Sequence, residues 1–109
     1  MQRTYIVDVK KSSEKTVMLR GWVHKIHDLG KITFIQLRDK TGIIQLVADD
    51  EFKQNLRLEM SIEVIGDKVE NEKALGGVEV TIKELSILGK AYYDILPFEV
   101  NGYKLNASL

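Results

Sequence analysis

The sequence predicts an all-β fold in which five short strands close a Greek-key barrel, with one short helix between the third and fourth strands. Three observations support this prediction. Most of the chain up to residue 88 consists of segments in which apolar and polar side chains alternate, which is the two-residue period of a strand. Only one segment has helical spacing, and it falls in the middle of the chain. Asp, Asn and Gly residues separate the segments, as expected at tight turns.

The first three strands are predicted at residues 15–26, 31–39 and 42–49. Asp39 and Gly42 bracket a tight hairpin turn between the second and the third. In each strand one alternating row is apolar and is expected to face the core. These rows are Val17, Leu19, Gly21 and Val23, then Thr33, Ile35 and Leu37, then Ile44, Leu46 and Ala48.

The helix is predicted at residues 49–59. Asp49 or Asp50 can cap its N-terminus, because a carboxylate accepts hydrogen bonds from the free N–H groups of the first turn. Phe52 and Leu56 are four residues apart and would lie on one apolar face of the helix.

The last two strands are predicted at 60–70 and 78–88, joined by a loop at 71–77. Gly66 interrupts the fourth strand and indicates a bulge or a close packing contact. Three strands, a helix and two further strands form the order that is typical of the OB-fold. A flat meander or an SH3-like barrel shares part of this pattern, but the position of the helix favours the OB-fold.

Composition limits the class of protein. The 109 residues suit one domain, with 44% hydrophobic and 29% charged residues. Cysteine is absent, which excludes disulfides, thiolate metal sites and cysteine nucleophiles. His24 and His27 have no evident third ligand, and no nucleophile has a base nearby in the pattern, so we predict neither a metal site nor catalytic residues. No apolar segment approaches the roughly 20 residues of a membrane span, and we expect a cytoplasmic protein without membrane association.

The charges are divided unevenly, although the net charge is zero. Residues 1–48 hold nine Lys and Arg against four Asp and Glu, whereas residues 49–109 hold seven against twelve. Such an asymmetry is consistent with a basic face that contacts an anionic partner, and equally with scatter.

The face of the sheet opposite the core is the candidate binding surface. If the apolar rows point inward, Phe34, Gln45 and Glu79 point outward together. Unpaired bases stack on exposed aromatic rings. An amide matches a base edge with one donor and one acceptor, and a carboxylate matches the two adjacent donors of guanine. Basic residues expected close enough to contact phosphates are Lys25, Lys31 and Arg38. Single-stranded nucleic acid fits this set. Gln45 or Glu79 alone is more typical of a solvated surface residue, and only their joint placement with Phe34 favours binding.

The stretch RGWVHKIHDLGKITFIQLRDKTGIIQLV, residues 20–47, closely resembles the N-terminal anticodon-binding domain of aspartyl-tRNA synthetases. The shared pattern is G-W-V-(H/N), then D-L-G, F-I-x-L-R-D and T-G-I-x-Q. Asparaginyl enzymes share this domain and lysyl enzymes share a more distant version, but the unbroken D-L-G and L-R-D favour the aspartyl branch. The run ILPFEV, residues 95–100, is similar to the segment leading towards the catalytic domain. We therefore expect an OB-fold domain at 1–94 and the start of a linker at 95–109.

The resemblance implies roles for individual residues. Phe34 matches the phenylalanine that stacks on the middle anticodon base, a uridine, and Gln45 matches the glutamine that hydrogen-bonds the same base. Glu79 matches the glutamate that reads guanine at the first anticodon position. Supporting or phosphate-contacting positions are expected at Arg20, Trp22, Lys25, His27, Lys31 and Arg38.

The resemblance also implies a partner and a parent enzyme. The partner is the anticodon loop of aspartate tRNA, or also asparagine tRNA, because the two share their first two anticodon bases. The parent is a class II, ATP- and magnesium-dependent aspartate–tRNA ligase, usually a homodimer. The sequence stops at YKLNASL without room for a catalytic domain. This chain alone is thus expected to bind no cofactor and to catalyse no aminoacylation.

The sequence departs from the family pattern at two places, and three alternative functions stay open. Where bacterial-type members often carry arginines, the chain reads HKIHDLG, and the basic residues expected between strands four and five are largely replaced by KVENEKALGG. An asparaginyl-type domain is one alternative. A protein-interaction module using Phe34, Ile43 and Val47 is another. The third is an OB module that binds single strands without sequence preference.

Overall fold

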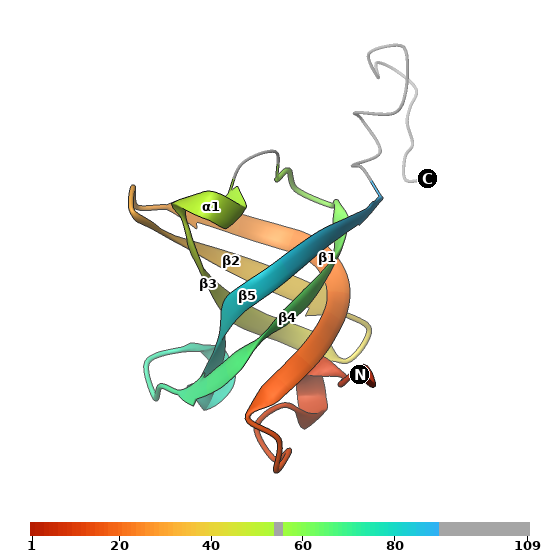
Figure 1. Ribbon diagram of the computed structural model, residues 1–109. Helices are drawn as coiled ribbons and strands as arrows, with labels where there is room; N and C mark the ends of the chain where they lie inside the picture. Colours follow the sequence, from red (N-terminus) through yellow and green to blue (C-terminus); the bar gives the residue numbers. More distant parts are fainter. Residues whose placement is uncertain (54–55, 90–109) are drawn as a thin grey trace.

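Five strands form one sheet that closes into a barrel in the computed structural model, which describes residues 1–53 and 56–89 (Figure 1). The strands are β1 (Thr16–Asp28), β2 (Ile32–Asp39), β3 (Gly42–Asp49), β4 (Ser61–Glu70) and β5 (Val78–Gly89). Around the barrel their order is β1-β2-β3-β5-β4, and β4 returns to pair with β1. Only β3 and β5 pair in parallel among these strands. The predicted all-β fold is confirmed, whereas the predicted boundary between 1–94 and 95–109 lies outside the described residues.

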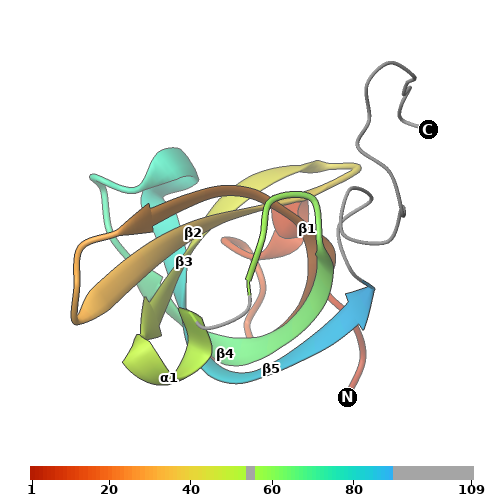
Figure 2. The same cartoon turned by 90° about the horizontal axis from the view of Figure 1, so that it is seen from above.

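The inward row of each strand is the one that the alternation predicts. Side chains with essentially no exposure come from every strand and form one core inside the barrel. Figure 2 shows the ribbon of the barrel from above. The largest of these core side chains are Leu19, Ile35, Leu37, Ile44, Leu46 and Ile62. Thr33 lies in the same layer and is also fully buried. Because side chains alternate along a strand, burying these rows turns the intervening residues outward.

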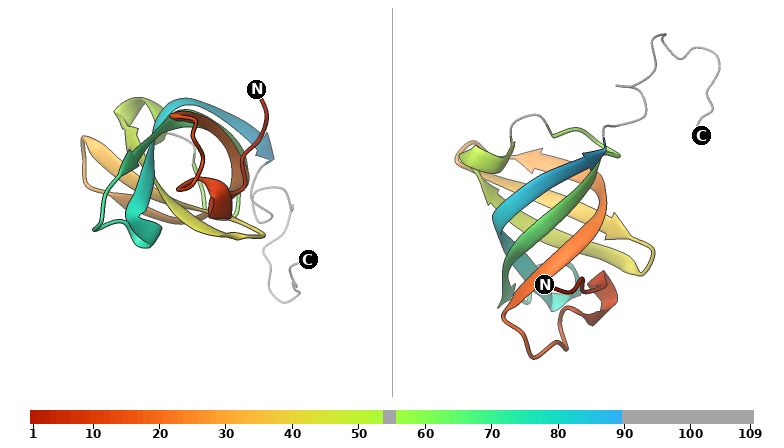
Figure 3. Two further views of the ribbon diagram at one scale, coloured as in Figure 1. Left: turned by 90° about the horizontal axis from the view of Figure 1, so that it is seen from below. Right: turned by 45° about the vertical axis from the view of Figure 1, so that its right-hand side comes forward.

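Short helices lie at opposite ends of the barrel (Figures 1 and 3). The 3-10 helix η1 (Ile6–Asp8), which the sequence does not predict, adds its first residue to the core beside the start of β3. At the other end, α1 (Asp50–Lys53) follows β3, and Phe52 packs against the core. The side chain of Asp49 caps α1, with its Oδ1 3.0 Å from a backbone nitrogen of the first turn.

The helix is shorter than predicted. The expected range was 49–59, but α1 ends at Lys53 and residues 56–60 are not helical. Hydrogen bonds to β1 explain the difference. The N–H of Glu59 donates to the carbonyl of Val23 at 2.7 Å, and the N–H of Val23 donates to the carbonyl of Met60 at 2.9 Å. A helix that continued to residue 59 could not make these bonds to β1. Backbone pairing between distant segments therefore prevails over the local helical propensity.

Three register shifts bend the sheet. In β1 the register shifts between Val23 and Lys25, which leaves His24 as the extra residue. Between β4 and β5 the register shifts twice, and both extra residues lie on β5: Leu88, opposite the step from Ser61 to Ile62, and Lys83, opposite the step from Ile65 to Gly66. A Cβ at Gly66 would lie 2.2 Å from the carbonyl oxygen of Thr81, so the predicted close packing at Gly66 is confirmed, and the bulge beside it lies on β5.

No helix among residues 1–53 and 56–89 is long and apolar enough to cross a membrane.

Candidate nucleic-acid interface

Two rows of side chains cross four neighbouring strands on the outside of the barrel. The glutamine row consists of Lys25, Gln36, Gln45 and Glu79, which are register partners from β1 through β2 and β3 to β5. The phenylalanine row consists of His27, Phe34, Val47 and Thr81, which are paired in the same way. None of the eight side chains is buried. The bulge at His24 brings Lys25 and His27 into these rows, because it shifts the alternation of β1 relative to β2.

Phe34 lies on the outer face, as predicted. Its strand neighbours Thr33 and Ile35 are fully buried, whereas the ring of Phe34 is half-buried between His27 and Val47. A ring held between two flanking strands is an apolar platform beside the polar side chains of the glutamine row.

Gln45 and Glu79 contact each other directly. The amide Nε2 of Gln45 donates to Oε1 of Glu79 at 3.0 Å, from β3 to the parallel strand β5. The amide Nδ2 of Asn71 donates to the same oxygen, also at 3.0 Å. An ionised carboxylate only accepts hydrogen bonds, so both amides must turn their NH2 groups towards it. The structure therefore joins two of the predicted residues and adds a third that the sequence analysis missed.

Asn71 also organises the loop between β4 and β5. Its Oδ1 accepts the N–H of Lys73 at 3.0 Å, and its own N–H donates to the carbonyl of Gly77 at 3.1 Å. Gly76 and Gly77 adopt φ values of 77° and 79°, which suit glycine. The loop includes the 3-10 turn η2 (Leu75–Gly77). In the sequence, the local signal for a loop organised by Asn71 is an asparagine at the start of NEKALGG, which ends in the pair Gly76 and Gly77.

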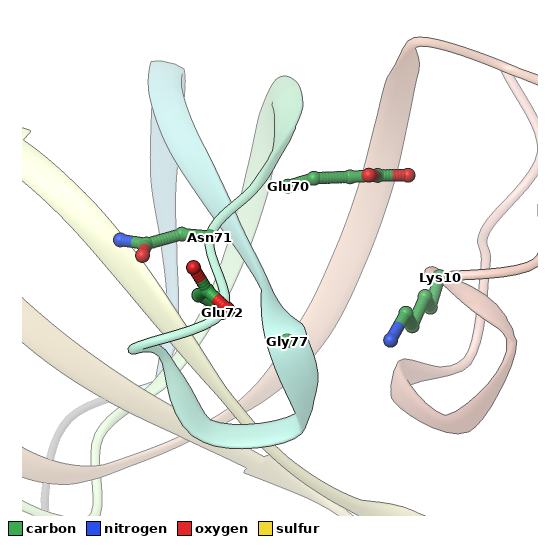
Figure 4. A pocket seen from close by; sticks show the side chains of 5 residues that line it. All are labelled: Lys10, Glu70, Asn71, Glu72 and Gly77. Carbon is green, nitrogen blue, oxygen red and sulfur yellow. The ribbon is translucent and has the colours of Figure 1, made fainter.

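A cleft of about 500 Å³ opens beside this loop. It is lined by Lys10, Glu70, Asn71, Glu72 and Gly77. Figure 4 shows Lys10, from the N-terminal segment, on the opposite side of the cleft from Asn71 and Glu72. The cleft thus adjoins the glutamine row through Asn71, and its lining carries both signs of charge.

Arg38 is held by neighbouring side chains. Its guanidinium donates to both carboxylate oxygens of Glu59, at 2.6 and 3.2 Å, and lies 3.1 Å from Nδ1 of His24. It also lies 5.8 Å from the centre of the Trp22 ring. The hydrogen bonds with Glu59, more than the charges, raise the pKa of Arg38 and lower the pKa of Glu59 against the opposing effect of burial. Arg38 supports the structure beside the glutamine row.

The other predicted supporting residues divide into two groups. Arg20 pairs with Glu63 on β4 at 2.8 Å and lies away from the two rows. Trp22 is 44% exposed between Arg38 of β2 and Ser61 of β4, so it lies beside the end of the glutamine row with Arg38. Lys25 and His27 are exposed members of the rows. Lys31 is exposed in the hairpin between β1 and β2, one residue before the second strand.

The barrel and its outer rows define the class of protein. A family model described as an OB-fold nucleic acid binding domain, and named for the tRNA anticodon, matches residues 17–88. This chain belongs to that family.

Curated relatives of this chain include aspartate–tRNA ligases. The chain is 41% identical to the aspartate–tRNA(Asp/Asn) ligase of Archaeoglobus fulgidus, in a match that covers 90% of this chain and 25% of the relative. It is 38% identical to the enzyme of the same name from Methanopyrus kandleri, over 100% of this chain and 27% of the relative. The chain thus spans about a quarter of the length of these curated relatives.

Solved structures of related synthetases have the same fold as this chain. The asparaginyl-tRNA synthetase of Pyrococcus horikoshii, complexed with asparaginyl-adenylate, superposes with a TM-score of 0.76 at 30% identity, covering 89% of this chain and 24% of that chain. An OBody bound to hen egg-white lysozyme shares the fold, with a TM-score of 0.60 at 20% identity, over 70% of this chain and 83% of that chain. The resemblance to the anticodon-binding domain of the aspartyl and asparaginyl synthetases is confirmed.

Proposed function

We propose that this chain is the anticodon-reading domain of an aspartate–tRNA ligase and binds the anticodon loop across the glutamine and phenylalanine rows. The observation that supports this most strongly is the hydrogen bond between Gln45 and Glu79, at 3.0 Å, on the same outer face as Phe34. An acceptor-only carboxylate, an oriented amide and an aromatic ring lie on adjacent rows of three strands. Such a set reads base edges rather than phosphates alone.

Each residue of the set has a distinct task. The ring of Phe34 stacks on the middle base, a contact worth roughly 1–3 kcal/mol. Gln45 hydrogen-bonds the edge of that base. Glu79 accepts hydrogen bonds from the N1–H and N2–H donors of guanine at the first position, where adenine offers no such pair.

Exposed polar side chains of β1 and its hairpin complete the interface. Lys25, His27 and Lys31 lie at or beside the two rows, where phosphates of a bound loop would run. The contribution of the two lysines is electrostatic, so binding weakens as salt concentration rises. In the parent enzyme, ATP and Mg²⁺ would act in a catalytic domain, and the enzyme would work as a cytoplasmic homodimer.

A titration of anticodon stem-loops tests the proposal. Fluorescence anisotropy at low salt compares loops with GUC, GUU and GCC anticodons against the wild type and Phe34→Ala. We expect a preference for GUC over GCC that the variant loses. Leu88→Ala is the matched control, because Leu88 is an exposed apolar residue of β5 outside both rows.

The same titration separates the alternatives. The ratio of GUC to GUU affinities reports whether asparagine tRNA is accepted as well. Equal binding of all three loops, unchanged in Phe34→Ala, contradicts anticodon reading and leaves a protein-interaction module. Equal binding that Phe34→Ala weakens for every loop points to a single-strand binder without sequence preference.

A further inference from the structure

We propose that Glu79 also determines the choice of the middle anticodon base, by fixing the orientation of the Gln45 amide. This inference rests on the proposed function. It gives Glu79 a second task as a positioning residue, in addition to its contact with the first base. The two anticodon positions are then read by one coupled pair of side chains.

The carboxylate permits only one orientation of the amide. Nε2 of Gln45 lies 3.0 Å from Oε1 of Glu79. If the amide turned over, its carbonyl oxygen would face the carboxylate oxygen, and two acceptors would repel each other. Asn71 donates to the same oxygen at 3.0 Å, which keeps the carboxylate from swinging away from Gln45. The carbonyl oxygen and the second N–H of Gln45 therefore occupy fixed positions relative to a base that binds on this face.

The neighbour on the other side of Gln45 cannot impose this order. Gln36 is the cross-strand partner of Gln45 on β2. Its amide both donates and accepts, so it can pair with either orientation of Gln45. Glu79, which only accepts, is the neighbour that selects one.

A fixed amide distinguishes uracil from cytosine. Uracil has a donor, N3–H, between two carbonyl oxygens, so the amide oxygen accepts from N3–H while the free N–H donates to a flanking carbonyl. Cytosine has a lone pair at N3 and an amine at C4. In a base held in place by stacking on Phe34, the lone pair at N3 would then face the Gln45 oxygen. Pairing with cytosine needs the amide to turn over, which the charge of Glu79 opposes.

Glu79→Gln removes the constraint with little change in shape. The new amide can face Gln45 with either its NH2 group or its oxygen, so Gln45 becomes free to turn. Dissociation constants are measured for GUC, GCC and AUC stem-loops, using the full chain. We expect the preference for GUC over GCC to fall by about tenfold, the size of one base-edge discrimination. Glu84→Gln is the matched control, because it makes the same charge change at an exposed position of β5.

A double-mutant cycle tests whether Glu79 acts through Gln45. In a Gln45→Ala background, Glu79→Gln should leave the ratio of GUC to GCC unchanged. Asn71→Ala, which frees one side of the carboxylate, should lower that ratio less than Glu79→Gln does. This second variant also keeps the proposal testable if Glu79→Gln fails to fold.

The outcomes separate this inference from the proposed function. A wild type that does not prefer GUC over GCC overturns the proposed function itself. A wild type with that preference, and a Glu79→Gln variant that keeps it while losing selection of GUC over AUC, leaves anticodon reading intact and overturns the coupling. An equal loss of affinity for all three loops in Glu79→Gln also overturns the coupling. A residue that only stabilises the fold would weaken binding of every loop by the same factor.

Discussion

Arg38 on β2 and Glu59, two residues before β4, are joined by two hydrogen bonds of 2.6 and 3.2 Å. The pair ties the connection that follows α1 to the barrel wall. Glu59 also adopts a φ of 67°, which is uncommon for a residue with a side chain. Its backbone bond to Val23 and its ion pair with Arg38 together hold this conformation.

Glu59→Gln should lower the free energy of unfolding by up to about 1 kcal/mol, since both side chains are partly exposed and water screens the pair. The hydrogen bonds from Arg38 lower the pKa of Glu59 in the folded state. The stabilisation is therefore present above the unfolded pKa and is lost as pH falls through the lower folded pKa. Urea unfolding of both proteins at neutral pH and at about pH 3 checks this. A stability difference that persists unchanged in acid contradicts the assignment.

The two-residue alternation of the sequence predicts which strand side chains face the core and which face outward. Burial of Ile35 and Leu37 follows from alternation, and the outward placement of Phe34 follows with it. Contacts between distant segments were not predictable in this way. Asn71 reaches Glu79 through a loop whose shape depends on glycine φ values, and no periodicity encodes that contact.

The helix shows the same limit. Local spacing favours helix over residues 49–59, because it does not register the bonds that the end of this segment makes with Val23. The bulge at His24 is likewise invisible in the alternation of β1, although it decides that Lys25 and His27 join the two rows. Pairing across the sheet therefore sets these details.

Asp39 joins the β2–β3 hairpin to η1, and Asp39→Asn should weaken this junction. Its Oδ2 accepts the N–H of Ile6 at 2.9 Å, while Oδ1 accepts the hydroxyl of Thr41 at 2.6 Å and two backbone N–H groups of the turn. An amide in its place turns an NH2 group towards one of these donors. We expect a loss of about 1–3 kcal/mol in the free energy of unfolding at neutral pH.

The pH dependence gives an independent check on Asp39. Burial by itself would raise the pKa of Asp39, but the hydrogen bonds from Thr41, Ile6 and Gly42 outweigh it and lower the pKa. Its contribution to stability is thus complete above the unfolded pKa, about 3.9, and disappears as pH falls through the folded value. Denaturant titrations of wild type and variant should converge in acid. Asp8→Asn, a change within η1 at a side chain that is 46% exposed, should differ from wild type by no more than about 0.5 kcal/mol.

Gly66→Ala should destabilise the barrel, because the added Cβ would lie 2.2 Å from the carbonyl oxygen of Thr81 and 2.7 Å from Cγ1 of Val80. Backbone on the neighbouring strand cannot move aside without breaking the β4–β5 pairing. We expect a cost of about 1–3 kcal/mol in guanidinium unfolding. Gly42→Ala is the control, since its Cβ would meet only Cγ2 of Ile6, at an ordinary 3.6 Å. Similar losses in the two variants would show that the close approach at Gly66 is not the cause.

Lys31→Ala should weaken binding to every anticodon loop by the same factor. Lys31 is exposed in the hairpin beside the two rows, where its ammonium can contact phosphate but is not placed among the base-reading residues. Losing one phosphate contact should reduce the slope of log affinity against log salt by about 0.7–0.9 and leave the ratio of GUC to GCC unchanged. Gln45→Ala should do the opposite and reduce that ratio. Lys11→Ala is the charge-matched control, because Lys11 pairs with Asp8 at the η1 end of the barrel. An altered ratio in Lys31→Ala, or an equal loss in Lys11→Ala, would contradict a phosphate contact at Lys31.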